Sequence, residues 1–194
     1  MGCPVVELRR YTLHPGARDT LIELFDRELV ETQDAVGARV LGQFRDRDDP
    51  DQFVWLRGFE DMDVRRDALE AFYGGPVWAA HKDAANATMV AFDDVLLLTP
   101  ERDDTGLALP DQRSGPAADL IVTIDPLEPV GTPPPAPEAL ASFVTLRVPN
   151  TFPSLPVRED VHVCVRVWRE APEEVGPAGR VTLRLAPTPR SLLR

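Results

Sequence analysis

The sequence is short of lysine, cysteine and histidine. Among 194 residues there are one lysine (Lys82), two cysteines and three histidines. Cys3 and Cys164 lie far apart and show no metal-ligand spacing, so the sequence predicts neither a disulfide framework nor a zinc site. We therefore expect a reduced, cytoplasmic protein without a bound cofactor.

Long apolar runs and a positive charge excess are also missing. The apolar runs span only a few residues, whereas a membrane helix needs about 20. The formal net charge is −11, and such a field repels a phosphate backbone. Membrane and nucleic-acid partners are thus disfavoured, and a small-molecule ligand remains open.

The first half of the chain alternates between strand and helix patterns. Apolar residues recur at helical spacing, and Gly74-Gly75-Pro76 separates two helices. Asp61 or Asp63 is placed to cap the first of these two. The expected elements are strand 5–11, helix 17–32, strands 39–44 and 52–59, helices 61–73 and 76–91, and strand 95–98. This is the ferredoxin-like βαββαβ order with its second helix doubled, an α+β fold.

The second half is rich in proline and poor in helix signals. A polar linker covers 102–118, and four strands are expected at 120–124, 142–148, 161–168 and 181–185. The segment 53–60 can be laid over 162–169, which matches Arg57 with Arg166. We interpret residues 1–101 as one ferredoxin-like unit and 119–194 as a degenerate, helix-poor repeat of it.

Each strand of the first unit has one aliphatic and one polar-aromatic side. Val54 and Leu56 alternate with Trp55 and Arg57, and neighbours in a strand point to opposite faces. We expect the aliphatic side to lie under the helices. The polar-aromatic side would then face a second sheet, and the two sheets would enclose a ligand cavity in an α/β barrel.

Several motifs of the first half resemble the NIPSNAP family of the dimeric α/β-barrel superfamily. They are ELRRYTLHPG at 7–16, LGQF at 41–44, VWLRGFED at 54–61, RR at 65–66 and PVW at 76–78. The resemblance implies ferredoxin-like units paired into a barrel, and its superfamily includes cofactor-independent monooxygenases, haem-degrading enzymes, isomerases and cyclases. A homodimer or an intrachain pseudo-dimer would complete the barrel.

Candidate site residues gather on the polar-aromatic face. Arg9 and Arg57 are suited to hold a carboxylate or enolate, and Tyr11 is suited to donate a proton. The alternative is an internal ion-pair layer in which Glu7 balances both arginines. Further ligand-binding candidates are Phe44, Trp55, Trp78 and Arg166.

His81 shares a helix face with Trp78, three residues earlier. It is a candidate general base or, less favoured, a haem ligand. The alternative is a half-exposed histidine beside Lys82.

Two hypotheses about function follow. The first is a cofactor-independent enzyme for proton transfer, cyclisation or oxygenation of a small anionic or aromatic metabolite. The second is a non-catalytic binding or assembly protein, which a barrel filled by its own side chains would favour.

Overall fold

A computed structural model describes residues 3–128, 131–172 and 176–194 of the chain. The first half contains four strands and five helical segments, and the order is β-α-β-β-α-β when the consecutive segments α1, η1 and α2, and likewise α3 and α4, are each counted as one helical unit. Their bounds are β1 Val5–Leu13, α1 Arg18–Leu24, η1 Phe25–Leu29, α2 Val30–Ala35, β2 Arg39–Asp46, β3 Gln52–Phe59, α3 Met62–Tyr73, α4 Pro76–Asn86 and β4 Met89–Pro100.

The second half contributes four more strands. They are β5 Leu120–Pro126, β6 Ala141–Thr145, β7 Val163–Trp168 and β8 Val181–Pro187. All the strands pair antiparallel into one closed barrel in the order β1-β3-β2-β8-β5-β7-β6-β4. Read by halves, the order is β4-β1-β3-β2 and β8-β5-β7-β6, so both halves repeat one arrangement. The expected duplication is confirmed, and the barrel closes within a single chain.

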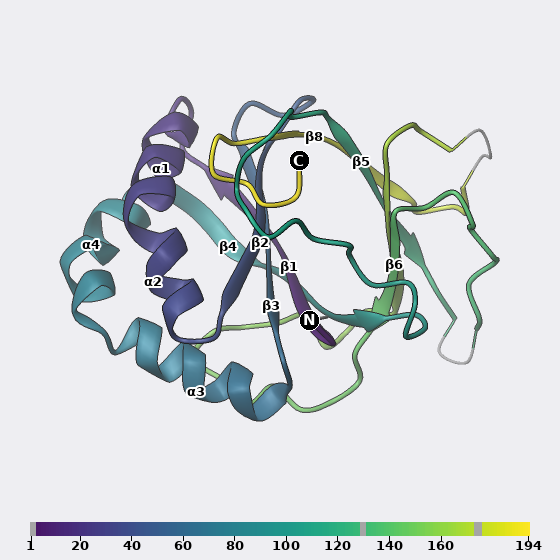
Figure 1. The fold of residues 1–194 in the computed structure, drawn as a ribbon, viewed down its shortest axis with the longest axis horizontal. Helices are drawn as coiled ribbons and strands as arrows, with labels where there is room; N and C mark the ends of the chain where they lie inside the picture. Colours follow the sequence, from purple (N-terminus) through teal and green to yellow (C-terminus); the bar gives the residue numbers. More distant parts are fainter. Residues whose placement is uncertain (1–2, 129–130, 173–175) are drawn as a thin grey trace.

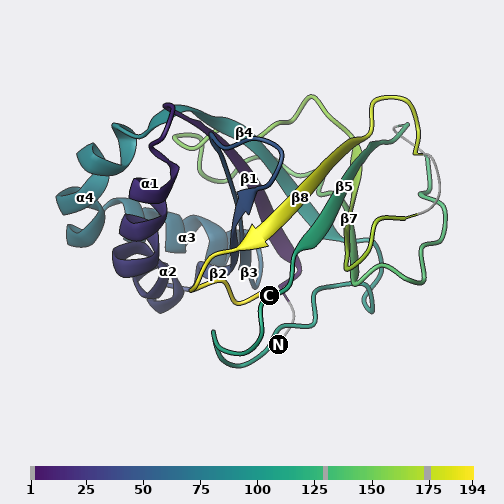
Figure 2. The same ribbon diagram turned by 90° about the horizontal axis from the view of Figure 1, so that it is seen from above.

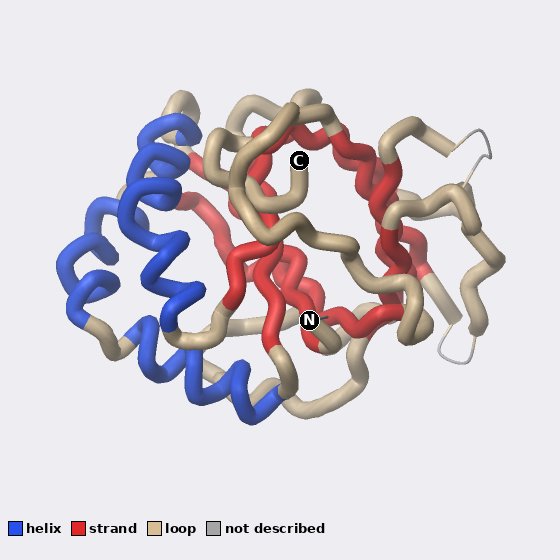
Figure 3. The backbone as a smooth tube through the Cα atoms, viewed as in Figure 1, coloured by secondary structure: helices blue, strands red, loops and turns tan. Residues whose placement is uncertain are grey.

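The helices all lie on one side of the barrel, over the strands of the first half (Figures 1 and 3). A view from above shows β5, β7 and β8 on the other side, with loops around them (Figure 2). In the described residues the second half contains no helix, as its proline content predicted. No helix in these described ranges is long and apolar enough to cross a membrane.

The predicted cap of α3 and the predicted position of Pro76 are confirmed by the structure. The Asp61 side chain accepts a hydrogen bond from the Val64 amide at 2.7 Å and so caps α3, as expected. Pro76 occupies the first turn of α4, where its missing N–H is harmless. The helix expected over 17–32 is instead interrupted by the π-helical turn η1, and β4 begins six residues earlier than expected.

The barrel interior is apolar and mostly aliphatic. One buried cluster draws on all eight strands and includes Leu8, Leu56, Leu96, Val122 and Leu185. Residues from the two halves therefore share a single hydrophobic core.

The expected assignment of the two sheet faces is wrong. Tyr11 and Trp55 pack with Phe25, Leu29 and other residues of the covering helices, outside the barrel. The physical reason is hydrogen-bonding capacity: an interior lined by aliphatic side chains offers Arg57 no partner, whereas the helices do. A polar-aromatic cavity inside the barrel is thus ruled out.

The shared core predicts that the first half alone cannot remain a folded monomer. A chain of residues 1–101 would leave the aliphatic faces of β1, β3 and β4 uncovered, and so large an apolar patch drives association. Light scattering should show a soluble monomer for the full chain and oligomers or aggregates for 1–101. A folded monomer of 1–101 would contradict the shared core.

Candidate active site beneath the helices

Three buried arginines surround one carboxylate beneath the helices. Glu7 Oε2 lies 2.7 Å from Arg9 Nη1 and 2.8 Å from Arg57 Nε, and Glu7 Oε1 lies 2.7 Å from Arg65 Nε. All four side chains have zero exposure. We call Glu7, Arg9, Arg57 and Arg65 the arginine cluster.

Strand register and one helix place these side chains. Glu7 is paired with Arg57 across β1 and β3, and Arg9 follows two residues later on the same face. Arg65 comes from α3, where it shares a buried face with Ala68, Leu69 and Phe72. Sheet and helix thus deliver charges to opposite sides of one carboxylate.

The π-helical turn holds Gln33, a hydrogen-bond partner of the arginine cluster. Gln33 Nε2 donates to the Leu29 carbonyl, the last residue of η1, at 3.1 Å. Its Oε1 then accepts from Arg57 Nη1 at 3.0 Å. Single π turns inside helices are rare and occur often at functional sites.

The second half of the chain completes the surroundings of Arg65. Arg65 Nη1 donates to Asn150 Oδ1 at 3.0 Å and lies 3.3 Å from Thr151 Oγ1. Both acceptors belong to the connection between β6 and β7, residues 146–162. The cluster is therefore built by both halves.

Aromatic rings enclose the two strand arginines. The Arg9 guanidinium carbon lies 5.4 Å from the Trp55 ring centroid and 5.5 Å from that of Tyr11. The Arg57 carbon lies 5.1 Å from Trp55 and 5.9 Å from Tyr73. Such cation–π contacts favour the charged guanidinium in a dry environment.

The cluster carries an excess of two positive charges, three guanidiniums against one carboxylate. The two other buried acids of the described chain are engaged elsewhere, Asp125 with Arg180 and Asp46 with the Asp48 amide. Within the described residues, Nη2 of Arg9, Arg57 and Arg65 and the Trp55 indole nitrogen have no hydrogen-bond partner. Every unpartnered group here is a donor.

The ionisation states follow from these neighbours. Burial alone would raise the pKa of Glu7, but Arg57, Arg9 and Arg65 outweigh it and lower that pKa well below its ordinary value. Burial raises the pKa of the Tyr11 phenol, although the Arg9 charge opposes this. Arg9 Nε donates to the Tyr11 oxygen at 2.9 Å. Glu7 is therefore ionised and Tyr11 protonated at neutral pH.

The structure gathers some of the sequence candidates and separates others. Arg9, Tyr11, Trp55 and Arg57 meet at the cluster, and Trp78 lies one ring further out, 5.1 Å from Tyr73. His81 lies apart on α4, with Nε2 3.7 Å from Glu28. The other two candidates are elsewhere: Phe44 belongs to the barrel interior, and Arg166 lies on β7, where it donates to the Pro134 carbonyl.

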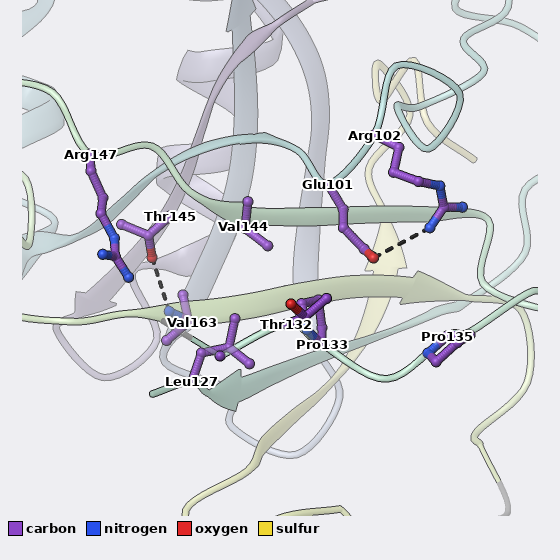
Figure 4. A pocket seen from close by; sticks show the side chains of 11 residues that line it. Glu101, Arg102, Leu127, Thr132, Pro133, Pro135, Val144, Thr145, Arg147 and Val163 are labelled. Carbon is purple, nitrogen blue, oxygen red and sulfur yellow. Dashed lines mark hydrogen bonds and ion pairs between the residues drawn. The ribbon is translucent and has the colours of Figure 1, made fainter. Parts of the chain in front are cut away.

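A pocket of about 540 Å³ lies beside β6 and β7, between these strands and the neighbouring loops (Figure 4). Glu101, Thr132, Pro133 and Arg147 line it, and none of the candidate residues does. Its position shows where loops, rather than helices, cover the second sheet.

Sequence reasoning missed Gln33, Arg65 and Asn150 as members of the site. A signal for Arg65 was present, because a charge at position 65 falls on the same helical face as Leu69 and Phe72. No such signal marks Gln33 or Asn150, whose roles depend on a π turn and on a long connection from the other half.

Glu7 should contribute strongly to stability, because it is the counter-charge of three buried arginines. Glu7→Gln leaves three buried guanidiniums without a carboxylate and should lower the free energy of unfolding by about 3–5 kcal/mol. The exposed Glu23→Gln is the matched control and should change it by less than about 0.5 kcal/mol.

The free energy of unfolding lost in Glu7→Gln should become smaller as the pH falls. Because the folded pKa of Glu7 lies below its ordinary value of 4.5, its contribution is complete above that pH and shrinks as the pH falls further. In urea titrations, the difference between wild type and Glu7→Gln should narrow below pH 4.5. A difference that widens on acidification would contradict the ion-pair assignment.

Three comparisons place the chain among known proteins. Residues 6–101 match the NIPSNAP family model. An uncharacterized NIPSNAP-like domain protein from Burkholderia xenovorans has 28% identity, with a TM-score of 0.46, over 50% of this chain and 84% of its own. No curated protein matches the chain.

Two solved structures match nearly the whole chain. A proposed monooxygenase from Fusobacterium nucleatum has a TM-score of 0.59 at 9% identity and covers 96% of this chain and 93% of its own. One from Lactobacillus acidophilus has a TM-score of 0.57 at 11% identity and covers 95% and 94%. At such identities the likeness shows the fold alone. This chain therefore belongs to the NIPSNAP family, and its two halves form the barrel of the dimeric α/β-barrel superfamily within one polypeptide.

Proposed function

We propose that this protein binds a small anionic metabolite at the arginine cluster, between the first sheet and its helices. The observation that carries the proposal is the uncompensated pair of positive charges at zero exposure. Buried charges are costly unless they are paired, and here one carboxylate serves three guanidiniums.

The unpartnered groups define the chemistry of the ligand. Three guanidinium nitrogens and one indole nitrogen are all donors, so the complementary ligand presents acceptors only. Carboxylate and enolate oxygens are of this kind, and guanidinium forks bind them with charge-assisted hydrogen bonds. Trp55 and Tyr11 add flat aromatic surface beside the arginines.

An internal ion-pair layer explains less of the geometry. In such a layer Glu7 would balance Arg9 and Arg57, but Arg65 adds a third charge that no further acid in the cluster offsets. Structural stabilisation by Glu7 and ligand binding by the free nitrogens are compatible, because they use different edges of the same guanidiniums.

Proton transfer to the bound anion is a second candidate, favoured by the state of Tyr11. Its phenol is protonated, buried and held by Arg9 Nε at 2.9 Å. A neutral phenol beside two guanidiniums is suited to donate a proton to an enolate oxygen or carbon.

Replacing Arg65 should weaken anion binding while the charges of Arg9, Arg57 and Glu7 remain. Arg65→Met leaves Glu7 paired with Arg9 and Arg57, and loss of one charge-assisted contact should reduce malonate affinity about tenfold or more in calorimetry. Arg66→Met, on the same helix but paired with Asp63 and Asp67 at the surface, is the control and should bind as wild type does. Equal affinities in all three proteins would refute the proposed site.

Tyr11→Phe separates binding from proton transfer. The variant keeps the guanidiniums and the ring but loses the hydroxyl, so malonate affinity should change little. The enolate forms when the α-proton of an enolisable β-keto acid passes to water, and Tyr11 returns a deuteron from D2O to its carbon; the protein-dependent part of this incorporation, measured by NMR above the protein-free rate, should disappear in the variant. Undiminished incorporation in Tyr11→Phe would remove Tyr11 as the proton donor.

A further inference from the structure

A second pocket, of about 430 Å³, lies between β4 and the β6–β7 connection. Its size falls within the roughly 300–1,000 Å³ of small-molecule sites. Its apolar wall is formed by Leu97, Leu146, Val148, Pro149 and Val157, and the rest of its lining is polar or charged: Thr145, Arg147, Arg158, Glu159 and His162. Nothing in the arginine cluster lines it, yet two of its wall residues adjoin that cluster directly.

The first adjoining residue is Leu97. It is the cross-strand partner of Glu7 in the pairing of β1 with β4, so both side chains stand on the same outer face. Directly opposed side chains have Cβ atoms about 4.5–5.5 Å apart. The pocket therefore begins one strand away from the carboxylate at the centre of the cluster.

The second adjoining residue is Pro149. It lines the pocket, and the next residue, Asn150, accepts the hydrogen bond from Arg65 Nη1 at 3.0 Å. Asn150 also donates from Nδ2 to the Leu155 carbonyl at 2.9 Å, which holds this turn of the connection in place. The pocket wall and the amide that binds Arg65 therefore belong to consecutive residues of one turn.

The connection also runs beside α3 (Figure 1), the helix that carries Arg65. Phe152 stacks on Tyr73 at 5.9 Å between ring centroids, and Tyr73 lies against Arg57. Thr151 Oγ1 donates to the Met62 carbonyl at the start of α3. Asn150 gives Arg65 a neutral acceptor, and a carboxylate in its place would form a stronger bond because both partners would then be charged.

We propose that the pocket and the arginine cluster form one binding site for an amphiphilic carboxylate. The carboxylate replaces the Asn150 amide on Arg65, and an unbranched apolar chain lies along the wall from Leu97 to Val157. This inference rests on the proposed function for its anionic head and adds the apolar body. The ligand class is then a fatty or acyl-chain carboxylate rather than a purely polar dianion.

The test is the chain-length dependence of carboxylate binding. Calorimetry on the full chain with acetate, butanoate, hexanoate and octanoate should show affinity rising about fourfold for each added methylene that becomes buried. Octan-1-ol, which lacks the head group, should bind more weakly than octanoate.

Two variants locate the two ends of the ligand. Val157→Trp fills the half-buried wall and should abolish the gain from acetate to octanoate while leaving acetate unchanged. Val181→Trp, on β8 and outside the pocket, should behave as wild type. Arg65→Met should weaken acetate and octanoate by the same factor.

The outcomes separate this inference from the proposed function. If affinity does not rise from acetate to octanoate, the apolar pocket is not part of the site, and the arginine cluster alone remains as an anion site. If octanoate binds wild type and Arg65→Met with equal affinity, its carboxylate lies elsewhere, for example at Arg158 in the pocket lining. That result would also overturn the inference. If no carboxylate binds, the proposed function fails as well.

Discussion

One carboxylate holds three guanidiniums in a space closed to water, and the architecture of the first half follows from this arrangement. Glu7 engages Arg9 and Arg57 from the sheet and Arg65 from α3, so a single side chain ties a strand pair to the helix above it. Each partner needs the others, because a buried charge without a counter-charge is strongly destabilising. In the described structure the same geometry leaves Nη2 of all three arginines without a hydrogen-bond partner. The arginine cluster is therefore a candidate binding site as well as a stabilising contact.

The cluster also explains why the two sheet faces lie as they do. The closed barrel encloses aliphatic side chains from both halves, and such an interior cannot satisfy polar groups. Helices can, since Gln33, Arg65 and the π turn supply hydrogen-bond partners of the right length. The alternation of residues in the strands predicted the membership of each face correctly. It could not show which face the helices cover, because both faces are buried.

Other features of the site lay beyond what the sequence alone could predict. The order of elements, the Asp61 cap and the clustering of Arg9 with Arg57 follow from local patterns and strand period. No local pattern marks the π turn at Phe25–Leu29, and the hydrogen bond from Arg65 to Asn150 joins residues that are 85 positions apart. The resemblance of 6–101 to NIPSNAP proteins identified the fold, but it left the role of the second half open.

The second half shows what remains of such a unit without its helices. Its strand order repeats that of the first half, and Arg166 occupies β7 as Arg57 occupies β3. The partner of Arg57 across β1 and β3 is Glu7, whereas the partner of Arg166 across β5 and β7 is the neutral Thr123. This half instead closes the barrel, and its β6–β7 connection contacts the arginine cluster through Asn150. The described residues therefore form one eight-stranded barrel with one such cluster.

The most direct test is a crystal structure of the protein grown in the presence of bromide, read by anomalous scattering. We predict a bromide peak among Nη2 of Arg9, Arg57 and Arg65, beside the Trp55 indole nitrogen, because these donors lack partners and the cluster carries excess positive charge. A structure in which those nitrogens bond to protein carbonyls or open to bulk water, with bromide found only at the surface, would contradict the account.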